Sequence, residues 1–130
     1  MKIILVVDND VTLVESLIEL LEAEGYRVVS AKNGKDGLAQ VQKENPDLVL
    51  TNFRMPIADG LDLVQGVRSL PEFRSLPVVM MSPNHKGVPL SSDPMVRTIG
   101  ISAFLSKPFG LDELLHIIER LIGKGEPGKA

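Results

Sequence analysis

Short continuous runs of Val, Ile and Leu alternate along the chain with longer segments whose apolar residues recur at helical spacing. A short continuous apolar run is typical of a strand that is covered on both faces. Runs of this kind predict buried strands at residues 3–7 and 47–51, and further strands are predicted at residues 26–31, 77–81 and 102–105. The longer segments predict amphipathic helices between the strands, because helical spacing places their apolar side chains on one face.

Residues with special backbone preferences indicate where the predicted helices begin and end. Asp10 can cap the first helix, and Gly25 can end it in a left-handed conformation. Asn33-Gly34 predicts a turn before the second helix, which must stop before Pro46. These signals separate each expected helix from the strand that follows it.

Strands that alternate with helices predict βαβ units and therefore a parallel sheet with right-handed crossovers. With further helices near residues 61–70 and 111–122, the pattern predicts an α/β fold: a doubly wound (βα)5 sheet of five parallel strands in a single domain. We assign residues 1–122 to this domain and residues 123–130, GKGEPGKA, to a flexible tail or linker. For residues 82–100 the prolines predict a long loop and then a short helix with Asp93 at its N-cap.

Composition narrows the classes of function. The chain has 130 residues, a net charge of −3 and a pI of about 5.4. A mildly acidic domain is not expected to bind nucleic acid directly, because it lacks a basic surplus to offset phosphate repulsion. Cysteine is absent from the sequence, which excludes disulfides and cysteine-based zinc sites and agrees with a cytoplasmic location. The N-terminal run KIILVV is too short to cross a membrane, so we predict a buried strand there.

Polar residues follow four of the five predicted strands. They are Asp8, Asn9 and Asp10 after the first strand, Asn52 after the third, Ser82 after the fourth and Lys107 after the fifth. In a doubly wound sheet the carboxyl ends of the strands meet, and ligands bind there. Carboxylates can hold Mg²⁺, and Mg²⁺, lysine and a hydroxyl together can clamp a phosphoryl group during transfer. Asp10 is more simply explained as a helix cap than as a ligand.

Four ordered stretches of the chain resemble the receiver domain of two-component response regulators. They are ILVVDND, PDLVLTNFRMPIADG, LPVVMMS and AFLSKPF, and the resemblance covers residues 2–122. It implies a flavodoxin-like fold and a cytoplasmic signalling module that is not an enzyme beyond its own phosphotransfer. The implied partners are a histidine kinase or phosphotransfer protein and a downstream output protein or domain. A homodimer through the face formed by the fourth helix, fifth strand and fifth helix is also implied.

The resemblance also assigns a metal site and an acceptor. Asp8 and Asn9 occupy the paired acidic positions that hold Mg²⁺ in the family, and the backbone carbonyl of Arg54 is expected as a further metal ligand. Asn52 occupies the position of the aspartate that receives the phosphoryl group from a histidine kinase.

Further roles come from the same resemblance. Ser82 stands where the family has the hydroxyl that bonds the phosphoryl group, and Lys107 stands where it has the lysine that pairs with that group. The bond between Lys107 and Pro108 is expected to be cis. Phe104 takes the place of the aromatic switch residue, which acts together with Ser82. Because Phe104 has no hydroxyl, we expect its switching to be muted.

Two amides depart from the family pattern, at Asn9 and Asn52. An acyl phosphate requires an anionic oxygen nucleophile, and the amide of Asn52 is neutral, so we expect no phosphorylation there. Three carboxylates and one lysine carry about two net negative charges, whereas Asp8 and Lys107 alone cancel. We therefore expect Mg²⁺ to bind weakly at best. Our hypothesis is that Lys107 pairs directly with Asp8 and takes over part of the metal's role.

Alternatives remain at the sequence level. Asn52 is either natural, which makes the chain a degenerate receiver, or a substitution for the acceptor aspartate of a competent one. A phosphorylation-competent receiver that uses Asp8 or Ser82 as the acceptor is a second hypothesis. A nucleotide- or flavin-binding relative is disfavoured because no G-x-G-x-x-G or Walker sequence follows the first strand.

Overall fold

A single five-stranded sheet forms the centre of the molecule, which a computed structural model describes at residues 1–83 and 100–126. The strands are β1 (Ile3–Val7), β2 (Arg27–Ala31), β3 (Leu48–Asn52), β4 (Val78–Pro83) and β5 (Ala103–Lys107). They lie in the order β2-β1-β3-β4-β5, and every neighbouring pair is parallel. The predicted sheet is confirmed, with small differences at the strand ends. Because β1 lies between β2 and β3, the strand order changes direction at β1, and in sheets of this kind ligands bind beyond the carboxyl ends of the strands at such a point.

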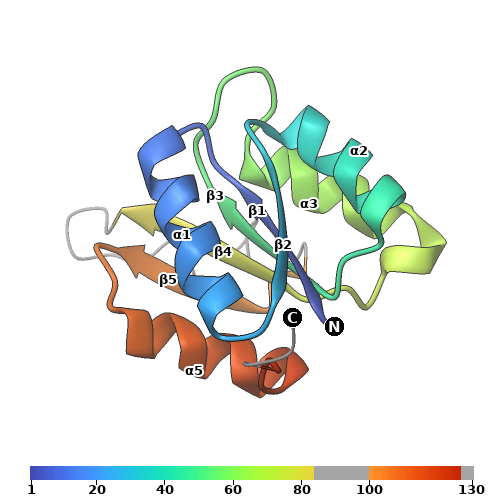
Figure 1. Cartoon of the computed structure of the whole chain (residues 1–130). Helices are drawn as coiled ribbons and strands as arrows, with labels where there is room; N and C mark the ends of the chain where they lie inside the picture. The colour runs from blue at the N-terminus through green and yellow to red at the C-terminus, as the bar shows by residue number, and fades with distance from the viewer. Residues whose placement is uncertain (84–99, 127–130) are drawn as a thin grey trace.

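Helices cover both faces of the sheet, as Figure 1 shows. They are α1 (Val11–Ala23), α2 (Gly34–Glu44), α3 (Gly60–Ser69), the short 3-10 helix η1 (Pro71–Phe73) and α5 (Leu111–Ile122). The helices α1 and α5 lie on one face, and α2 and α3 lie on the other (Figure 1). This is the doubly wound, flavodoxin-like arrangement of a single domain that the sequence predicts.

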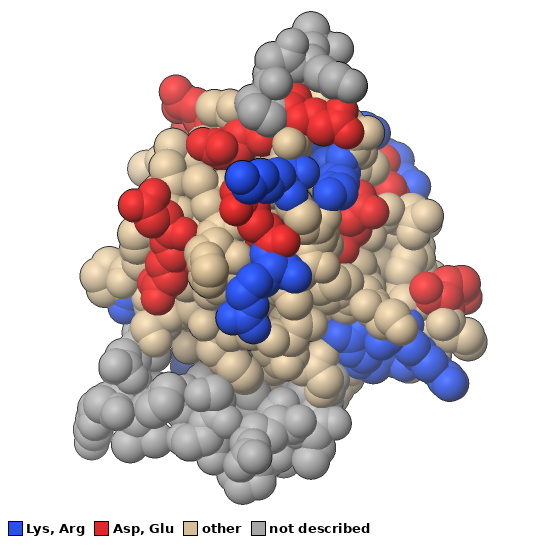
Figure 2. All heavy atoms as spheres, turned by 90° about the horizontal axis from the view of Figure 1, so that it is seen from below, with Lys and Arg blue, Asp and Glu red and all other residues tan. Residues whose placement is uncertain are grey.

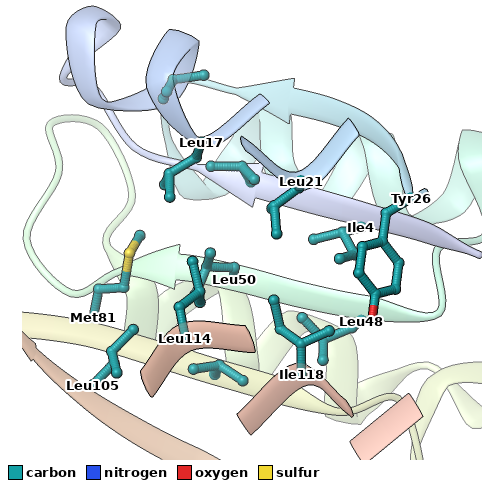
Figure 3. Packing of buried hydrophobic residues seen from close by; sticks show 13 residues of the cluster. Ile4, Leu17, Leu21, Tyr26, Leu48, Leu50, Met81, Leu105, Leu114 and Ile118 are labelled. Atoms are coloured by element: carbon teal, nitrogen blue, oxygen red, sulfur yellow. The ribbon is translucent and has the colours of Figure 1, made fainter. Parts of the chain in front are cut away.

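The face that α1 and α5 cover contains the larger apolar core, which we call the first core. Figure 3 shows Leu17 and Leu21 of α1 opposite Leu114 and Ile118 of α5, with strand residues between them. These four leucine and isoleucine side chains are 0–2% exposed. Burying a side chain of this size contributes about 1.5–3 kcal/mol. The first core therefore fixes both helices, and with them the position of the sheet's polar ends.

The opposite face carries a second core beneath α2 and α3. It joins Leu5 and Val7 of β1 to Leu63, Val64 and other residues of α3. In α2, a Cβ at Gly37 would lie 3.2 Å from a methyl group of Val7, so the helix approaches the sheet closely at this glycine. Such close packing sets the distance between α2 and the sheet.

Helix caps agree with the sequence in part. Asp10 caps α1 through its side chain, which accepts from the Leu13 N–H at 3.2 Å, and Gly25 has a φ of +91°, as predicted for the residue that ends the helix. The prediction of a turn at Asn33-Gly34 is wrong. Asn33 has an extended backbone and caps α2, because its side-chain oxygen accepts from the Asp36 N–H at 2.8 Å.

Arg68 holds the chain before β5, although no role was predicted for this residue. Its guanidinium donates to the carbonyls of Gly100 at 2.7 Å and Phe73 at 3.0 Å. Burial lowers the pKa of this guanidinium from its usual value. The loop and short helix predicted around Asp93 lie outside the described residues.

Part of the predicted tail contacts the domain. The Tyr26 hydroxyl donates to the Gly123 carbonyl at 2.8 Å, and the Glu126 N–H donates to the Gly25 carbonyl at 3.1 Å. These contacts place residues 123–126 against the turn between α1 and β2, close to the N-terminus (Figure 1). Residues 127–130 lie outside the described part of the chain, and the assignment of residues 123–130 as a linker stays a prediction.

Charges are mixed on the face that carries α5 and the chain ends. Figure 2 shows Lys and Arg side chains interspersed with Asp and Glu on this face, so the coloured residues form no continuous basic surface there. In the described ranges, no helix has the combination of length and apolar character that crossing a membrane needs.

Candidate functional site

The polar residues singled out in the sequence gather at the carboxyl end of the sheet. Asp8 follows β1 directly, Asn52 ends β3, Ser82 lies near the end of β4 and Lys107 ends β5. The register aligns these strand ends, with Asn52 opposite Met81 in the neighbouring strand. Parallel pairing therefore brings residues that are up to 99 positions apart to one end of the sheet. We call Asp8, Asn52, Ser82 and Lys107 the carboxyl-end cluster.

The residues of the carboxyl-end cluster follow two different faces of the sheet. Side chains two positions apart along a strand lie on the same face. The residues two positions before Asp8, Asn52 and Lys107 all belong to the first core, so these three follow the face of α1 and α5. Ser82 follows the second core, against which Phe104 packs. The predicted charge pair and the predicted switch pair thus lie on opposite faces of the sheet.

Asp8 and Lys107 form the ion pair that the sequence predicts. Lys107 Nζ lies 3.0 Å from Asp8 Oδ2, and the two side chains are 26% and 1% exposed. The other carboxylate oxygen, Asp8 Oδ1, accepts from the Asp10 backbone N–H at 3.0 Å. Both oxygens of the buried carboxylate therefore have a hydrogen-bond donor from the protein itself, which is what a buried charge needs.

Asn52 makes a hydrogen bond that an aspartate in its place could not make. Its side-chain nitrogen Nδ2 donates to the Arg54 backbone carbonyl at 2.8 Å. This carbonyl is the group that the resemblance assigns as a metal ligand. An ionised carboxylate only accepts hydrogen bonds, so the bond depends on the amide.

The loop after β3 packs closely around Asn52. The Gly60 N–H donates to the Phe53 carbonyl at 2.7 Å, and a Cβ at Gly60 would lie 2.5 Å from the Asn52 carbonyl oxygen. The Gly34 N–H of α2 donates to the Ala58 carbonyl at 2.7 Å. Only glycine permits these approaches. They hold the loop of residues 53–60 against β3 and the start of α2.

The remaining predicted residues are placed as follows. Asn9 is exposed next to Asp8, while Ser82 is only 7% exposed at the end of β4. Phe104 is half-buried. The bond between Lys107 and Pro108 is cis, as the resemblance implies. The roles of these residues in signalling stay predictions.

The donors of this arrangement do not fit Mg²⁺. A divalent ion of this kind needs free oxygen ligands and a surplus of negative charge. Both Asp8 oxygens and the Arg54 carbonyl already accept hydrogen bonds, and Lys107 cancels the charge of Asp8. Within residues 1–83 and 100–126, no group of three or more His, Cys, Asp or Glu residues could hold a metal ion.

Sequence reasoning missed two contributions to this end of the sheet. One is the Asp10 backbone N–H on Asp8, which follows from the tight turn into α1. The other is Thr51, which is fully buried and whose hydroxyl donates to the Asn52 carbonyl at 3.0 Å. A threonine directly before the acceptor position, in a run that is otherwise apolar, is the signal that could have identified it.

Comparison with known proteins gives a consistent result. Residues 4–119 match the response regulator receiver domain. Response regulator MprA of Mycobacterium leprae is 32% identical over 98% of this chain and 54% of its own length. The chain spans about half the length, 53–56%, of the first curated relatives that it matches.

Solved structures share the fold. Chemotaxis protein CheY4 of Vibrio cholerae superposes with a TM-score of 0.82 at 25% identity, covering 94% of this chain and 99% of that one. The receiver domain of sensor histidine kinase PA1611 from Pseudomonas aeruginosa has a TM-score of 0.79 at 23% identity, covering 94% and 98%. In that protein a magnesium ion is coordinated in the active-site cleft. With the match over residues 4–119 and a sheet of the same kind, this chain belongs to the family of response regulator receiver domains.

Proposed function

We propose that this chain is a receiver module of a two-component or phosphorelay system that is not phosphorylated at its acceptor position. It acts by binding other proteins in one fixed state. The observation that carries the proposal is the amide at the acceptor position, Asn52, with its nitrogen hydrogen-bonded to the Arg54 carbonyl.

The chemistry of the transfer supports this proposal. In the family, an anionic oxygen of the acceptor aspartate forms a bond to phosphorus as the bond between phosphorus and the kinase histidine nitrogen breaks. The amide of Asn52 carries no negative charge, and its nitrogen lone pair is delocalised into the carbonyl. Its nitrogen also donates to a fixed carbonyl, which orients the side chain. The position therefore lacks the nucleophile that the reaction needs.

A competent receiver with another acceptor is the alternative. Asp8 has the required negative charge, but it is 2% exposed and both of its oxygens accept hydrogen bonds. Ser82 is 7% exposed, and a hydroxyl needs a nearby base to become a nucleophile. The only carboxylate in the carboxyl-end cluster is paired with Lys107. These features favour the binding module over the alternative.

Partners follow from the family. We propose a histidine kinase or phosphotransfer protein and a downstream output protein or domain, in the cytoplasm, and a homodimer through the face that includes β5 and α5. Light scattering of the purified chain over a range of concentrations measures the dimer, and a mass that stays monomeric at every concentration contradicts it. Cell fractionation tests the location.

The decisive experiment is incubation of the full chain with a small-molecule phosphodonor and Mg²⁺, followed by mass analysis of the intact protein. We expect no phosphoryl adduct on the unaltered chain. Asn52→Asp is the matched variant, because it restores the nucleophile with almost no change of shape. We expect it to be labelled at position 52. An adduct on the unaltered chain, at Asp8, Ser82 or elsewhere, refutes the proposed function.

A further inference from the structure

The amide at position 52 does more than remove the nucleophile, because its nitrogen is hydrogen-bonded to the backbone carbonyl oxygen of Arg54. Asn52 Nδ2 and the Arg54 carbonyl are 2.8 Å apart, the length of a good hydrogen bond. With an aspartate at this position, two oxygens would face each other across this gap. A cation between them would then be needed to relieve their repulsion.

Lys107 provides a second N–H donor where the family would place a cation. Its ammonium is 3.0 Å from Asp8 Oδ2, on the same face of the sheet as Asn52. The remaining oxygen, Asp8 Oδ1, accepts from the Asp10 N–H. N–H donors of the chain itself are therefore bonded to both groups that the family would offer to an ion, the acidic side chain and the backbone carbonyl.

We propose that the side-chain amide of Asn52, together with Lys107, is a built-in substitute for the divalent cation. The cation would draw the Arg54 carbonyl and the acidic side chains together. Here the Asn52 amide holds the Arg54 carbonyl, and the Lys107 ammonium holds Asp8. The loop of residues 53–60 is consequently fixed with no ion required. This inference concerns the same site as the proposed function and rests on it only for the correspondence of these residues to the metal ligands of the family.

Loop geometry supports a role for Asn52 in positioning. Arg54 lies at the start of the loop, which the Gly60–Phe53 and Gly34–Ala58 backbone hydrogen bonds hold farther along. The Asn52–Arg54 bond is the side-chain contact that ties the first turn of the loop to the end of β3. Losing it releases the part of the loop that is nearest to the carboxyl-end cluster.

Thermal unfolding of the full chain in EDTA and in millimolar Mg²⁺ tests the inference. We compare the unaltered chain with Asn52→Asp, which replaces the donor with a charge, and with Asn52→Ala, which removes the donor without adding one. The unaltered chain should show the same Tm in both buffers. In EDTA both variants should melt about 5 °C lower, since one hydrogen bond of ordinary strength is lost. Mg²⁺ should raise the Tm of Asn52→Asp in a saturable way, with a smaller or absent rise for Asn52→Ala.

Three results would overturn the inference. The first is a saturable rise in Tm with Mg²⁺ for the unaltered chain. The second is a Tm for Asn52→Ala in EDTA equal to that of the unaltered chain. The third is no response of Asn52→Asp to Mg²⁺, confirmed by calorimetric titration. If Asn52→Asp unfolds in EDTA, recovery of its folded spectrum on adding Mg²⁺ supports the inference, and lack of recovery refutes it.

Phosphodonor labelling of the same unaltered sample separates this inference from the proposed function. A phosphoryl adduct on Asp8 or Ser82 would refute the proposed function while leaving the thermal result intact. Conversely, a Mg²⁺-dependent Tm with no adduct would refute only the inference. Peptide mapping of each sample confirms that Asn52 has not deamidated to aspartate, which would otherwise imitate the Asn52→Asp variant.

Discussion

The polar groups at the two ends of the sheet are satisfied by different kinds of partner. At the carboxyl end, side chains bond to one another across the sheet, as Lys107 does to Asp8. At the amino end, the short side-chain hydrogen bonds of the described residues go to backbone groups, and the ion pair there, between Arg27 and Glu44, is longer, at 3.7 Å. There the Asp47 carboxylate accepts from the Ile3 N–H at 2.7 Å, and the Ser102 hydroxyl accepts from the Val78 N–H at 3.1 Å.

The side-chain contacts at the two ends of the sheet therefore have different roles. A side chain that bonds to the backbone closes an open strand end, and its partner is always present. A buried ion pair instead depends on two particular side chains, and removing one leaves the other uncompensated. We therefore expect single substitutions to have larger effects at the carboxyl end, which is also the end at which the family carries out its chemistry.

The largest expected effect is that of Lys107→Met, which breaks the pair at the carboxyl end. It leaves Asp8 buried without a counter-charge, and breaking such a pair costs about 3 kcal/mol, near the lower limit because Lys107 is partly exposed. Urea unfolding measures the loss. Lys35→Met, an exposed lysine on α2, is the control and should change the unfolding free energy by less than about 0.5 kcal/mol.

A double variant sharpens this result. Adding Asp8→Asn to Lys107→Met removes the stranded charge, and we expect it to recover a large part of the lost stability. Additive losses in the two single variants and the double variant would show that the two groups are not coupled, contrary to the observed 3.0 Å contact.

At the amino end, the comparable test is Tyr26→Phe, with a smaller expected effect. It removes the hydrogen bond from the hydroxyl to the Gly123 carbonyl, which stabilises by about 1 kcal/mol. Burial raises the pKa of Tyr26 above its usual value, and the negative charges of Glu119 and Glu24 raise it further. A hydrogen bond with the Gly125 backbone lowers this pKa by a smaller amount than burial raises it. A raised pKa means that the folded state holds the proton more tightly. The contribution of Tyr26 is thus fully present below its unfolded pKa of about 10 and is lost as the pH rises through the folded pKa.

Unfolding free energies of both proteins between neutral pH and the alkaline range test this sign. The unaltered chain should lose stability above about pH 10 more steeply than Tyr26→Phe, so that the two curves converge. Curves that stay parallel would show that the tyrosine does not titrate differently in the two states. Hydrogen exchange at Glu126, whose N–H bonds to Gly25, reports whether residues 123–126 are released as the bond breaks.

Sequence predicted those parts of the molecule whose physics is local or set by charge. The buried strands β1, β3 and β4 follow from apolar runs that are covered on both faces, and the Asp8–Lys107 pair follows from having one acid and one base left at the same end. Asn33-Gly34 was assigned wrongly because asparagine favours both turns and helix caps, and only the extended backbone at Asn33 decides between them.

Other features depend on geometry that no local pattern encodes. The Asn52–Arg54 bond requires the particular path of residues 53–60, which the close approach of Gly60 to β3 fixes. The contact of residues 123–126 with Gly25 uses backbone groups, so a glycine- and lysine-rich composition gave no sign of it. Composition predicts how a segment behaves alone, whereas these contacts depend on what the rest of the fold places beside it.

The smallest expected effect again concerns the carboxyl end, at Ile57. This residue has a φ of +72° and is 81% exposed, in the loop after β3. Asn45, at the end of α2, has a similar φ of +51°, but asparagine tolerates that conformation and a β-branched residue does not.

Ile57→Gly should therefore stabilise the protein by about 0.5–1 kcal/mol, because relief of the backbone strain exceeds the added entropy of the unfolded chain. Ile57→Ala is the control, since it removes most of the exposed apolar surface while keeping a Cβ at positive φ, and its gain should be smaller. A glycine variant less stable than the alanine variant would mean that the Ile57 backbone is not strained. The loop would then owe its shape to the Asn52–Arg54 bond and its glycines, without opposition from Ile57.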